Sequence, residues 1–203
     1  MIIDTEKKFV TFKQLARILD INYRPTLEKI IEKFLKTGLL ERLEPGKYRV
    51  TMKDASVYEI ARFLYKPSYV SLESALSYHG ILSASPEIVT SVTLRKPKKK
   101  FVNGLWYTYS KITPRLFFGY KRCKGYSIAH RSKAVFDYLY FIAKGQRTID
   151  ALKTFNLSYV RENKVRRYVR YLTHRQTQLK ILDLVDLLFS YQPKSFPVVL
   201  ESK

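Results

Sequence analysis

The chain has 203 residues, with 38 lysines and arginines against 17 aspartates and glutamates, a formal net charge of +21. This length allows one large or two small domains. The sequence shows no long apolar run, signal peptide or basic amphipathic anchor, and the single cysteine, Cys123, excludes a disulfide framework. We therefore expect a cytoplasmic protein that does not associate with membranes.

The first predicted elements are two short helices and a hairpin. Thr11-Phe12-Lys13-Gln14 has the spacing of a capping box, and apolar residues follow it at helical spacing. Pro25 suits the first turn of a second helix, which Gly38 ends. Two short strands, residues 39–43 and 48–51, then flank the Glu44-Pro45-Gly46-Lys47 turn as a β-hairpin.

This order predicts a winged helix-turn-helix domain over residues 1–53. In such domains the second helix enters the major groove of DNA, and its N-terminal residues meet the base edges. Arg24, Thr26 and Lys29 would therefore face bases, and the later lysines and the wing would meet phosphates. The full predicted DNA-binding set is Asn22, Tyr23, Arg24, Thr26, Lys29, Lys33, Lys36, Arg42, Lys47 and Arg49.

Two features of this segment favour other interpretations. Glu28 and Glu32 also lie on the exposed side of the second helix, as they would on a solvated lysine face. Only about ten residues precede Thr11, too few for the full first helix that such domains usually contain. Many winged helices also serve only as protein-docking modules.

Residues 54–203 predict a mixed α/β domain with a small antiparallel sheet and a helical tail, which makes the whole chain an α+β protein. Asp54 is expected to cap one helix, and Ser71 to open another that Gly80 closes. Asn103-Gly104 is a strong turn signal between strands. The expected strands are residues 88–94, 105–109, 117–120 and 125–129, and the later helices are residues 133–143, 148–155, 160–173 and 179–189.

The positive charge is concentrated in the second part of the chain. Residues 1–65 have a net charge of +4 and residues 66–203 a net charge of +17, with no acidic residue between Glu87 and Asp137. Such a segment suits a polyanion or an acidic partner. We expect the lysine run at residues 96–100 at a hairpin tip. The predicted basic surface comprises Lys96, Lys98, Lys99, Lys100, Lys121, Arg122, Lys124, Arg131, Arg166, Arg167 and Arg170.

The residues needed for catalysis are not grouped in this sequence. Its histidines, His79, His130 and His174, are far apart and have no carboxylate or cysteine at metal-ligand spacing. No glycine-rich phosphate loop is present, and Cys123 is best interpreted as a surface structural cysteine. We therefore expect no catalytic residues, no metal and no cofactor, and the hypothesis of a nucleic-acid enzyme is disfavoured.

Four segments, in order, resemble the AbiEi-type antitoxins of the abortive-infection, type IV toxin–antitoxin systems. Residues 68–80, Ser-Tyr-Val-Ser-Leu-Glu-Ser-Ala-Leu-Ser-Tyr-His-Gly, resemble the motif that follows the winged helix in that family. Residues 89–93 resemble its first strand, residues 116–120 its phenylalanine-rich stretch, and residues 128–140 its strand-to-helix signature. The similarity spans about residues 10–143. It departs from the family at His130-Arg131-Ser132, where relatives often have a Thr-Pro-Glu-like cap.

The resemblance implies a DNA-binding transcriptional repressor that is also an antitoxin. Its winged helix would bind inverted repeats in its own promoter, and residues 54–203 would counter a nucleotidyltransferase toxin without forming a stable complex. Two alternatives stay open: an RNA- or protein-binding factor whose basic surface masks a toxin or its RNA substrate, and a stand-alone transcriptional regulator without a toxin partner.

Overall fold

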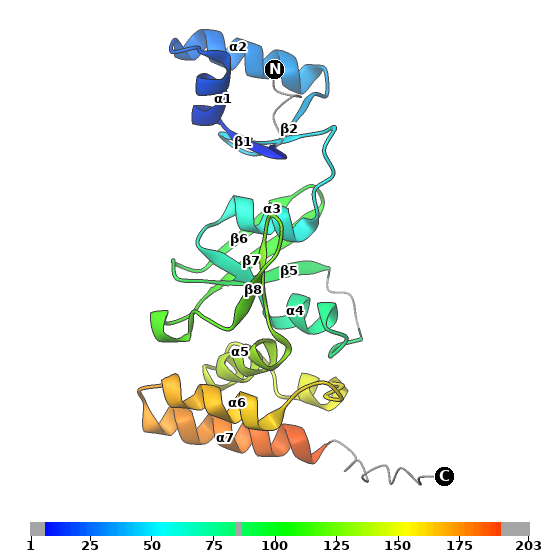
Figure 1. Cartoon of the computed structure of the whole chain (residues 1–203), viewed down its shortest axis with the longest axis vertical. Coiled ribbons are helices and arrows are strands. Elements are labelled where there is room, and N and C mark those ends of the chain that lie inside the picture. Colours follow the sequence, from blue (N-terminus) through cyan, green and yellow to red (C-terminus); the bar gives the residue numbers. More distant parts are fainter. Residues whose placement is uncertain (1–6, 84–86, 192–203) are drawn as a thin grey trace, which may run out of the picture. The chain divides into compact units, whose positions relative to one another are not determined.

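The computed structural model describes residues 7–83 and 87–191, and it confirms the predicted α+β class (Figure 1). Within these ranges the chain forms seven α-helices, three 3₁₀ helices and nine strands. None of these helices combines the length and the apolar character that crossing a bilayer requires. The described residues divide into two compact units, the first comprising residues 7–70, 87–111 and 122–127, and the second residues 71–83, 112–121 and 128–191.

The first two helices begin and end close to the predicted positions. α1 (Phe12–Leu19) starts at a complete capping box, in which the N–H of Gln14 donates to the Thr11 hydroxyl at 3.3 Å and the N–H of Thr11 donates to Gln14 Oε1 at 2.8 Å. α2 (Arg24–Lys36) is followed by Gly38 at φ 70°, a left-handed conformation that glycine adopts without steric cost. The two predicted helices are therefore present, in the predicted order.

A three-stranded antiparallel sheet completes this part of the first unit. Its strands are β1 (Phe9–Thr11), β2 (Leu40–Glu44) and β3 (Lys47–Val50), in the order β1-β3-β2. β1 pairs with β3, so that Phe9 lies opposite Arg49. The described residues before α1 therefore include a strand at the position where a winged helix usually has more of its first helix. Residues 1–6 of the predicted domain lie outside the described residues.

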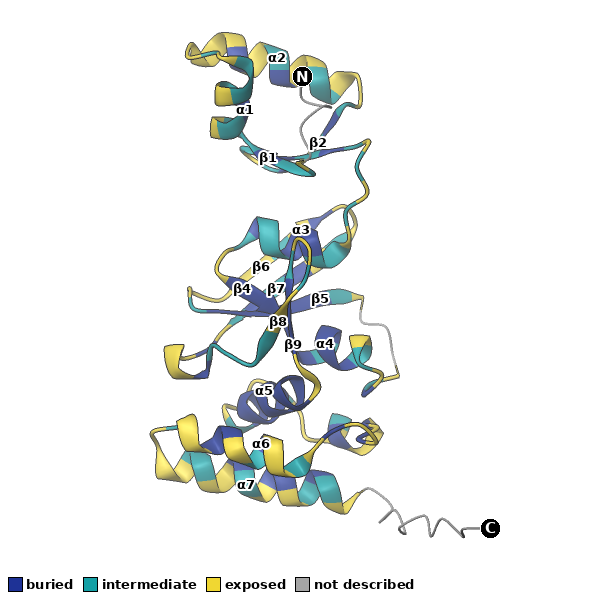
Figure 2. Cartoon of the chain, viewed as in Figure 1, coloured by how far each residue is buried: buried dark blue, intermediate teal, exposed yellow. Residues whose placement is uncertain are grey.

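The two helices and the small sheet enclose a core of their own. α1 and α2 bury their apolar stripes against the strands, while the outer side of α2 is largely exposed (Figure 2). Burying a large aliphatic side chain stabilises the folded state by about 1.5–3 kcal/mol. The apolar side of α2 therefore faces the core, and its opposite side faces the solvent. The fully buried members of the core are Val10, Leu15, Leu27, Ile31, Leu40, Tyr48 and Val50.

α3 (Val57–Leu64) begins at Ser56, and the prediction that Asp54 caps it is wrong. The Ser56 hydroxyl accepts from the N–H of Glu59 at 3.2 Å, and Glu59 Oε2 accepts from the N–H of Ser56 at 2.8 Å. This reciprocal pair satisfies two N–H groups at the helix start, whereas Asp54 lies too early in the chain to do so.

Contacts of α3 extend the first unit beyond the predicted domain boundary at residue 53. The Lys8 ammonium lies 2.9 Å from Glu59 Oε1, and the rings of Phe9 and Phe63 stack with centroids 4.8 Å apart. Because these contacts join residues before 53 to residues after it, residues 54–70 and 87–111 belong to the same compact unit as the N-terminal elements. The predicted division into residues 1–53 and 54–203 therefore differs from the division in the structure.

The larger sheet has six strands in the order β6-β7-β5-β4-β9-β8. β4 (Ser68–Val70) pairs antiparallel with β5 (Ile88–Thr93), but β5 pairs parallel with β7 (Leu105–Lys111). The sheet is thus mixed, which corrects the predicted antiparallel sheet. The cause is that β6 (Lys98–Val102) occupies the edge and β7 inserts beside β5. The last two strands, β8 (Tyr120–Arg122) and β9 (Ser127–Ala129), lie close to their predicted positions.

The β6–β7 hairpin corrects the predicted position of the lysine run. Asn103 (φ 53°) and Gly104 (φ 77°) form the turn, and their left-handed conformations match the type of turn that joins twisted strands. Lys98–Lys100 lie within β6, paired with residues 107–109 of β7, and not at the hairpin tip. Strand pairing therefore sends successive lysine side chains to opposite faces of the sheet.

The second unit is built around one buried helix. α5 (Arg131–Ala143) packs against α4 (Leu72–Tyr78), α6 (Glu162–Tyr168) and α7 (Arg175–Ser190). Each of its residues from 132 to 142 is buried, so α5 is covered on all sides and has no exposed polar face (Figure 2). The predicted helix at residues 148–155 is a 3₁₀ helix, η2 (Asp150–Thr154). The predicted helix at residues 160–173 is α6 followed by a second 3₁₀ helix, η3 (Val169–Tyr171). A further 3₁₀ helix, η1 (Pro114–Leu116), precedes β8.

A charged pair lies at the centre of this unit, which sequence patterns did not indicate. Lys133 and Asp137 form an ion pair one turn apart on α5, with both side chains fully buried. The Ser71 hydroxyl donates to Asp137 Oδ2 at 2.7 Å, and Lys133 Nζ lies 5.3 Å from the centroid of the Phe118 ring. Gly119 adopts φ 74°, and a Cβ built there would lie 3.0 Å from Lys133 Cγ. Lys133 is therefore a core residue and does not belong to a basic surface.

Candidate nucleic-acid interface

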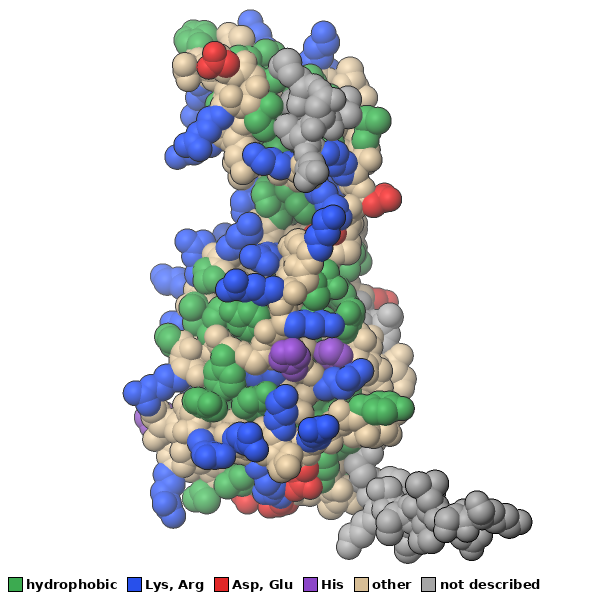
Figure 3. Space-filling view, viewed as in Figure 1, with side chains coloured by type: hydrophobic (Ala, Val, Ile, Leu, Met, Phe, Trp, Pro, Cys, Tyr) green, Lys and Arg blue, Asp and Glu red, His purple; other side chains and the backbone are tan. Residues whose placement is uncertain are grey.

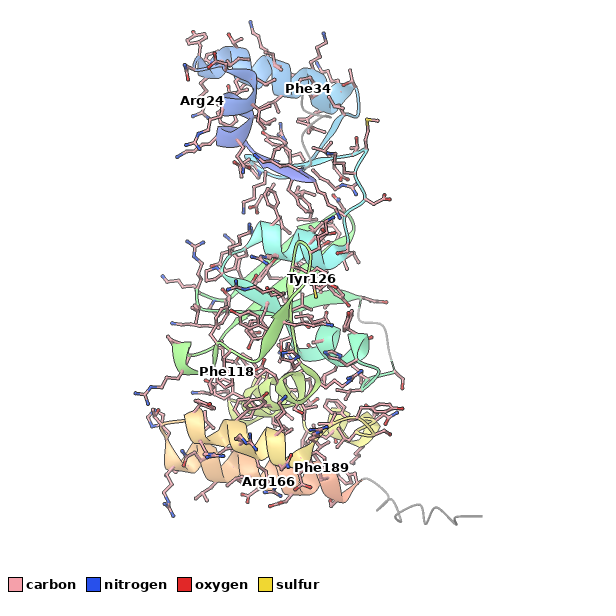
Figure 4. The ribbon with its side chains drawn as sticks, viewed as in Figure 1. Arg24, Phe34, Phe118, Tyr126, Arg166 and Phe189 are labelled. Atoms are coloured by element: carbon pink, nitrogen blue, oxygen red, sulfur yellow. The ribbon has the colours of Figure 1, made fainter. Side chains whose placement is uncertain are left out.

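The exposed side of α2 carries most of the predicted DNA-binding residues. Arg24 lies at the start of the helix, and Phe34 lies near its end (Figure 4). Because Leu27 and Ile31 are held in the core, the polar residues of α2 point away from it. The predicted residues exposed here are Asn22, Tyr23, Arg24, Thr26, Lys29, Lys33 and Lys36.

A hollow of about 890 Å³ lies between the start of α2 and the β2–β3 turn. Arg24 and Lys29 line it from α2, and Arg42 lines it from β2. Glu28 and Glu32 also line it, so two carboxylates partly offset the three cations. The structure thus brings three of the predicted residues together beside the hairpin, in a depression of mixed charge.

The carboxylates hold the basic side chains of α2 in place. Arg24 Nε lies 2.7 Å from Glu28 Oε1, and this hydrogen bond raises the pKa of Arg24. Lys36 Nζ lies 2.9 Å from Glu32 Oε1 and lowers the pKa of that carboxyl. Exposed ion pairs of this kind contribute little to stability, so a phosphate or a base edge can displace the glutamate.

Two predicted wing residues, Lys47 and Arg49, have partners within the first unit. Lys47 Nζ donates to the Leu64 carbonyl at 2.6 Å and lies 2.6 Å from Glu44 Oε1. Arg49 Nε lies 2.7 Å from Glu41 Oε2 across the β2–β3 pair. A phosphate that bound Lys47 or Arg49 would therefore compete with these partly buried contacts.

The lysines of the larger sheet divide into exposed and structural side chains. Lys96, Lys98 and Lys99 are exposed. Lys100, by contrast, forms an ion pair with Glu44 and donates to the Leu64 carbonyl at 3.0 Å. Its pKa is lowered because burial outweighs the attraction of Glu44. Lys100 therefore joins β6 to β2 within the unit, and the prediction that it forms part of a basic surface is corrected.

An aromatic pair accompanies the exposed lysines of β6. The rings of Phe101 and Trp106 lie 5.0 Å apart, and Lys99 Nζ lies 4.1 Å from the Trp106 centroid. Both rings are exposed although they are large and apolar. This strip could stack on bases or pack against a protein, and the sequence pattern had indicated only its lysines.

The other predicted basic residues are mostly exposed, with one exception. Arg166, labelled in Figure 4, forms ion pairs with Glu162 at 2.8 Å and with Asp186, and both raise its pKa. It joins α6 to α7 and is thereby removed from the predicted basic surface. The exposed residues of the set are Lys121, Arg122, Lys124, Arg131, Arg167 and Arg170.

A second hollow, of about 510 Å³, lies in the second unit beside the start of α5. It brings together His79 and His130, which are far apart in the sequence. Figure 3 shows histidine side chains near the middle of the displayed face, with lysine and arginine side chains next to them. The residues that line the hollow are Tyr78, His79, Lys121, His130, Arg131, Ser132, Tyr159, Arg161 and Lys164.

Burial and positive neighbours set the state of the two histidines. His79 Nε2 lies 2.7 Å from the Ala129 carbonyl, so the proton of the neutral ring is on Nε2 and Nδ1 is the acceptor. Burial, together with Arg131, Lys121 and His130, lowers the pKa of His79. Burial and the nearby ammonium groups of Lys164 and Lys121 likewise lower the pKa of His130. The hollow is therefore a concentration of positive charge.

Comparison with known protein-family models and with curated proteins gives no match to the chain. Among the described residues, no group of three or more histidine, cysteine, aspartate or glutamate side chains could hold a metal ion. The half-buried Cys123 is a free thiol. The features that bear on function are therefore the exposed face of α2, the basic strip on β6 and the hollow beside α5.

Proposed function

We propose that this protein is a cytoplasmic DNA-binding transcriptional repressor that also acts as an antitoxin of the type IV, AbiEi-like kind. In this proposal α2 binds the promoter inverted repeats as the recognition helix of a winged helix-turn-helix. The basic remainder of the chain counters a nucleotidyltransferase toxin without a stable complex, and neither catalysis, a metal nor a cofactor is involved.

The observation that carries the DNA-binding proposal is the orientation of α2. Its buried stripe packs on the small sheet, and its N-terminal residues Arg24, Thr26 and Lys29 are exposed beside the hairpin. Side chains at the start of a recognition helix reach base edges in the major groove, whereas later lysines reach phosphates. Lys29 and Lys33 form no ion pair within the described part of the chain, so both are available to a polyanion.

The test is a competition binding assay on the promoter fragment with the full chain. Replacing Arg24 and Lys29 with Ala should reduce the free energy of binding to the operator by about 1–3 kcal/mol for each bidentate contact with a base that is lost. The double variant should therefore discriminate less between sequences. The matched control is the double substitution Lys153→Ala and Lys180→Ala, which removes the same charge from exposed positions of the second unit. If the Arg24/Lys29 variant binds the operator as selectively as the unmodified protein does, α2 is not the recognition helix.

The antitoxin proposal supports a separate test in cells. Co-expression of the full chain with a nucleotidyltransferase encoded by a neighbouring reading frame should restore growth, and the Arg24/Lys29 variant should restore it equally well. Rescue that survives loss of operator binding separates antitoxicity from repression. Absence of rescue by a stably expressed chain, or absence of such a neighbouring gene, would leave a stand-alone transcriptional regulator.

A further inference from the structure

The hollow beside α5 gathers several cations and no carboxylate in one place. Arg147 of the same unit, by contrast, forms an ion pair with Glu73 at 2.5 Å. The four cations of the hollow are Lys121, Arg131, Arg161 and Lys164, and none of them forms an ion pair with a carboxylate of the described residues. No aspartate or glutamate is among its lining residues.

Each of the elements around the hollow contributes positive charge. Lys121 comes from β8, Arg131 from the first turn of α5, and Lys164 from α6. The hollow also adjoins the N-terminus of the 13-residue α5, where peptide dipoles leave partial positive charge and N–H groups without partners inside the helix. Mutual repulsion among these groups in a depression is unfavourable unless an anion binds there.

Two tyrosines at the hollow add aromatic surface to this charge. Tyr159 is 79% exposed and Tyr78 is 44% exposed, so part of each ring is accessible to a ligand. The Arg131 guanidinium lies 5.8 Å from the Tyr159 ring centroid, and Lys121 Nζ lies 5.4 Å from that of Tyr78. Exposed rings beside cations are the arrangement on which bases of single-stranded nucleic acids stack.

We propose that this hollow binds a phosphate-bearing nucleotide unit, with the phosphate among Lys121, Arg131 and Lys164 and the base against Tyr159. The unit is either a free nucleoside monophosphate or a residue of single-stranded RNA, since both offer the same chemistry. Its volume, about 510 Å³, lies within the range of about 300–1,000 Å³ typical of small-molecule sites. The proposal does not rest on DNA binding by α2, because all the residues of the hollow belong to the second unit.

The histidines provide a spectroscopic readout of binding. The positive neighbours Arg131 and Lys121 are among the causes that lower the pKa of His79, and Lys164 and Lys121 among those that lower the pKa of His130. A bound phosphate offsets this repulsion, so both histidine pKa values should rise when the nucleotide is added. Ring proton shifts followed by NMR across a pH titration report this change directly.

The binding test uses the full chain, with adenosine monophosphate, inorganic phosphate and a single-stranded RNA octamer as probes in calorimetric titrations. Replacing Lys121 and Lys164 with Ser should weaken binding of the nucleotide and the RNA at least tenfold, since a hydrogen bond to a charged group contributes about 1.5–3 kcal/mol. Replacing Tyr159 with Ala should weaken nucleotide and RNA binding but leave phosphate binding unchanged. The matched control is Lys153→Ser with Lys180→Ser, two exposed lysines of the same unit outside the hollow.

The probes of this experiment also separate the two sources of the nucleotide. Binding of the monophosphate without binding of either octamer identifies a free nucleotide. Competition of the monophosphate with the RNA, together with tighter binding of a 5′-phosphorylated octamer, identifies a strand end. A flatter salt dependence of RNA binding in the lysine variant, by about 0.7 log unit for each phosphate that is no longer neutralised, identifies binding within the strand. No binding of any probe at millimolar concentration, or equal binding by the Lys121/Lys164 variant and the unmodified protein, would overturn the proposal. Because all the substituted residues are exposed, unchanged thermal melts are expected.

Discussion

The buried ion pair of α5 allows a stability prediction whose sign and pH dependence follow from the structure. Lys133→Met removes the ammonium with little change of volume and leaves Asp137, fully buried, with the Ser71 hydroxyl as a donor. Removing one partner of a buried pair costs about 3–5 kcal/mol. The variant can limit this cost by protonating Asp137. For a carboxyl with an unfolded pKa near 3.9, protonation costs about 4 kcal/mol at pH 7 and about 1.4 kcal/mol less for each pH unit below that.

The reciprocal substitution reverses the pH dependence. Asp137→Asn leaves a buried ammonium at Lys133, whose pKa burial already lowers even with the carboxylate present. Releasing the proton of a lysine with an unfolded pKa near 10.4 costs about 4.6 kcal/mol at pH 7 and about 1.4 kcal/mol less for each pH unit above that. The stability lost by Lys133→Met should therefore decrease as the pH falls from 7 to 5, because protonating the buried Asp137 carboxyl becomes less costly. The stability lost by Asp137→Asn should decrease as the pH rises, because deprotonating the buried Lys133 becomes less costly.

Urea unfolding of the two single variants and the double variant between pH 5 and 9 measures both effects. The double variant should be more stable at pH 7 than the sum of the single losses implies, since no uncompensated charge remains. Lys153→Met is the control, because its partner Asp150 lies 4.0 Å away and the two side chains are 63% and 83% exposed. Single losses below about 1 kcal/mol, or losses that do not change with pH, would refute this account of the pair.

Two further predictions concern the lysines of β6 and the histidines of the hollow beside α5. Replacing Lys98 and Lys99 with Ser should flatten the salt dependence of duplex binding, measured by fluorescence anisotropy, by about 0.9 log unit for each phosphate that is no longer neutralised, and an unchanged slope would show that these lysines are only solvated. Lys100→Ser should instead lower the melting temperature, because it breaks the ion pair with Glu44. Because burial lowers the folded pKa of His79 and of His130 below the ordinary value of 6.5, the unfolded chain binds protons more readily, and stability should decrease as the pH falls from 7.5 to 5.5. The double variant His79→Asn and His130→Asn should lose less stability over that interval in urea melts, and an equal loss would contradict the assignment.

The sequence predicted the parts of the fold that depend on neighbouring residues. The Thr11–Gln14 capping box and the Asn103-Gly104 turn each need only a few consecutive residues, and both are confirmed. The three-residue strand β1 and the parallel pairing of β5 with β7 were missed. They are stabilised by hydrogen bonds to segments far along the chain, and no local periodicity reports such partners. For the same reason the lysines of β6 gave no strand signal of their own.

Functional residues were harder to predict where tertiary packing decides their environment. Lys133 and Asp137 have the i, i+4 spacing of an ordinary exposed helix pair, and only the surrounding helices bury them. Residues from distant segments meet at this pair: Ser71 donates to Asp137, and Phe118 and Gly119 lie against Lys133. His79 and His130 follow and precede different helices, so their common hollow depends on how α4 packs against α5.

Ion pairs offset part of the positive charge of this strongly basic chain within the fold. Lys133 and Arg166 have carboxylate partners of their own, and Lys47 and Lys100 share the carboxylate of Glu44. The cations of the hollow beside α5 have no carboxylate partner among the described residues, although they repel one another. Since unpaired charge in a depression does not stabilise the folded state, the fold does not account for its presence. A bound anion would account for this charge, and it would bind through exposed side chains whose removal leaves the core intact.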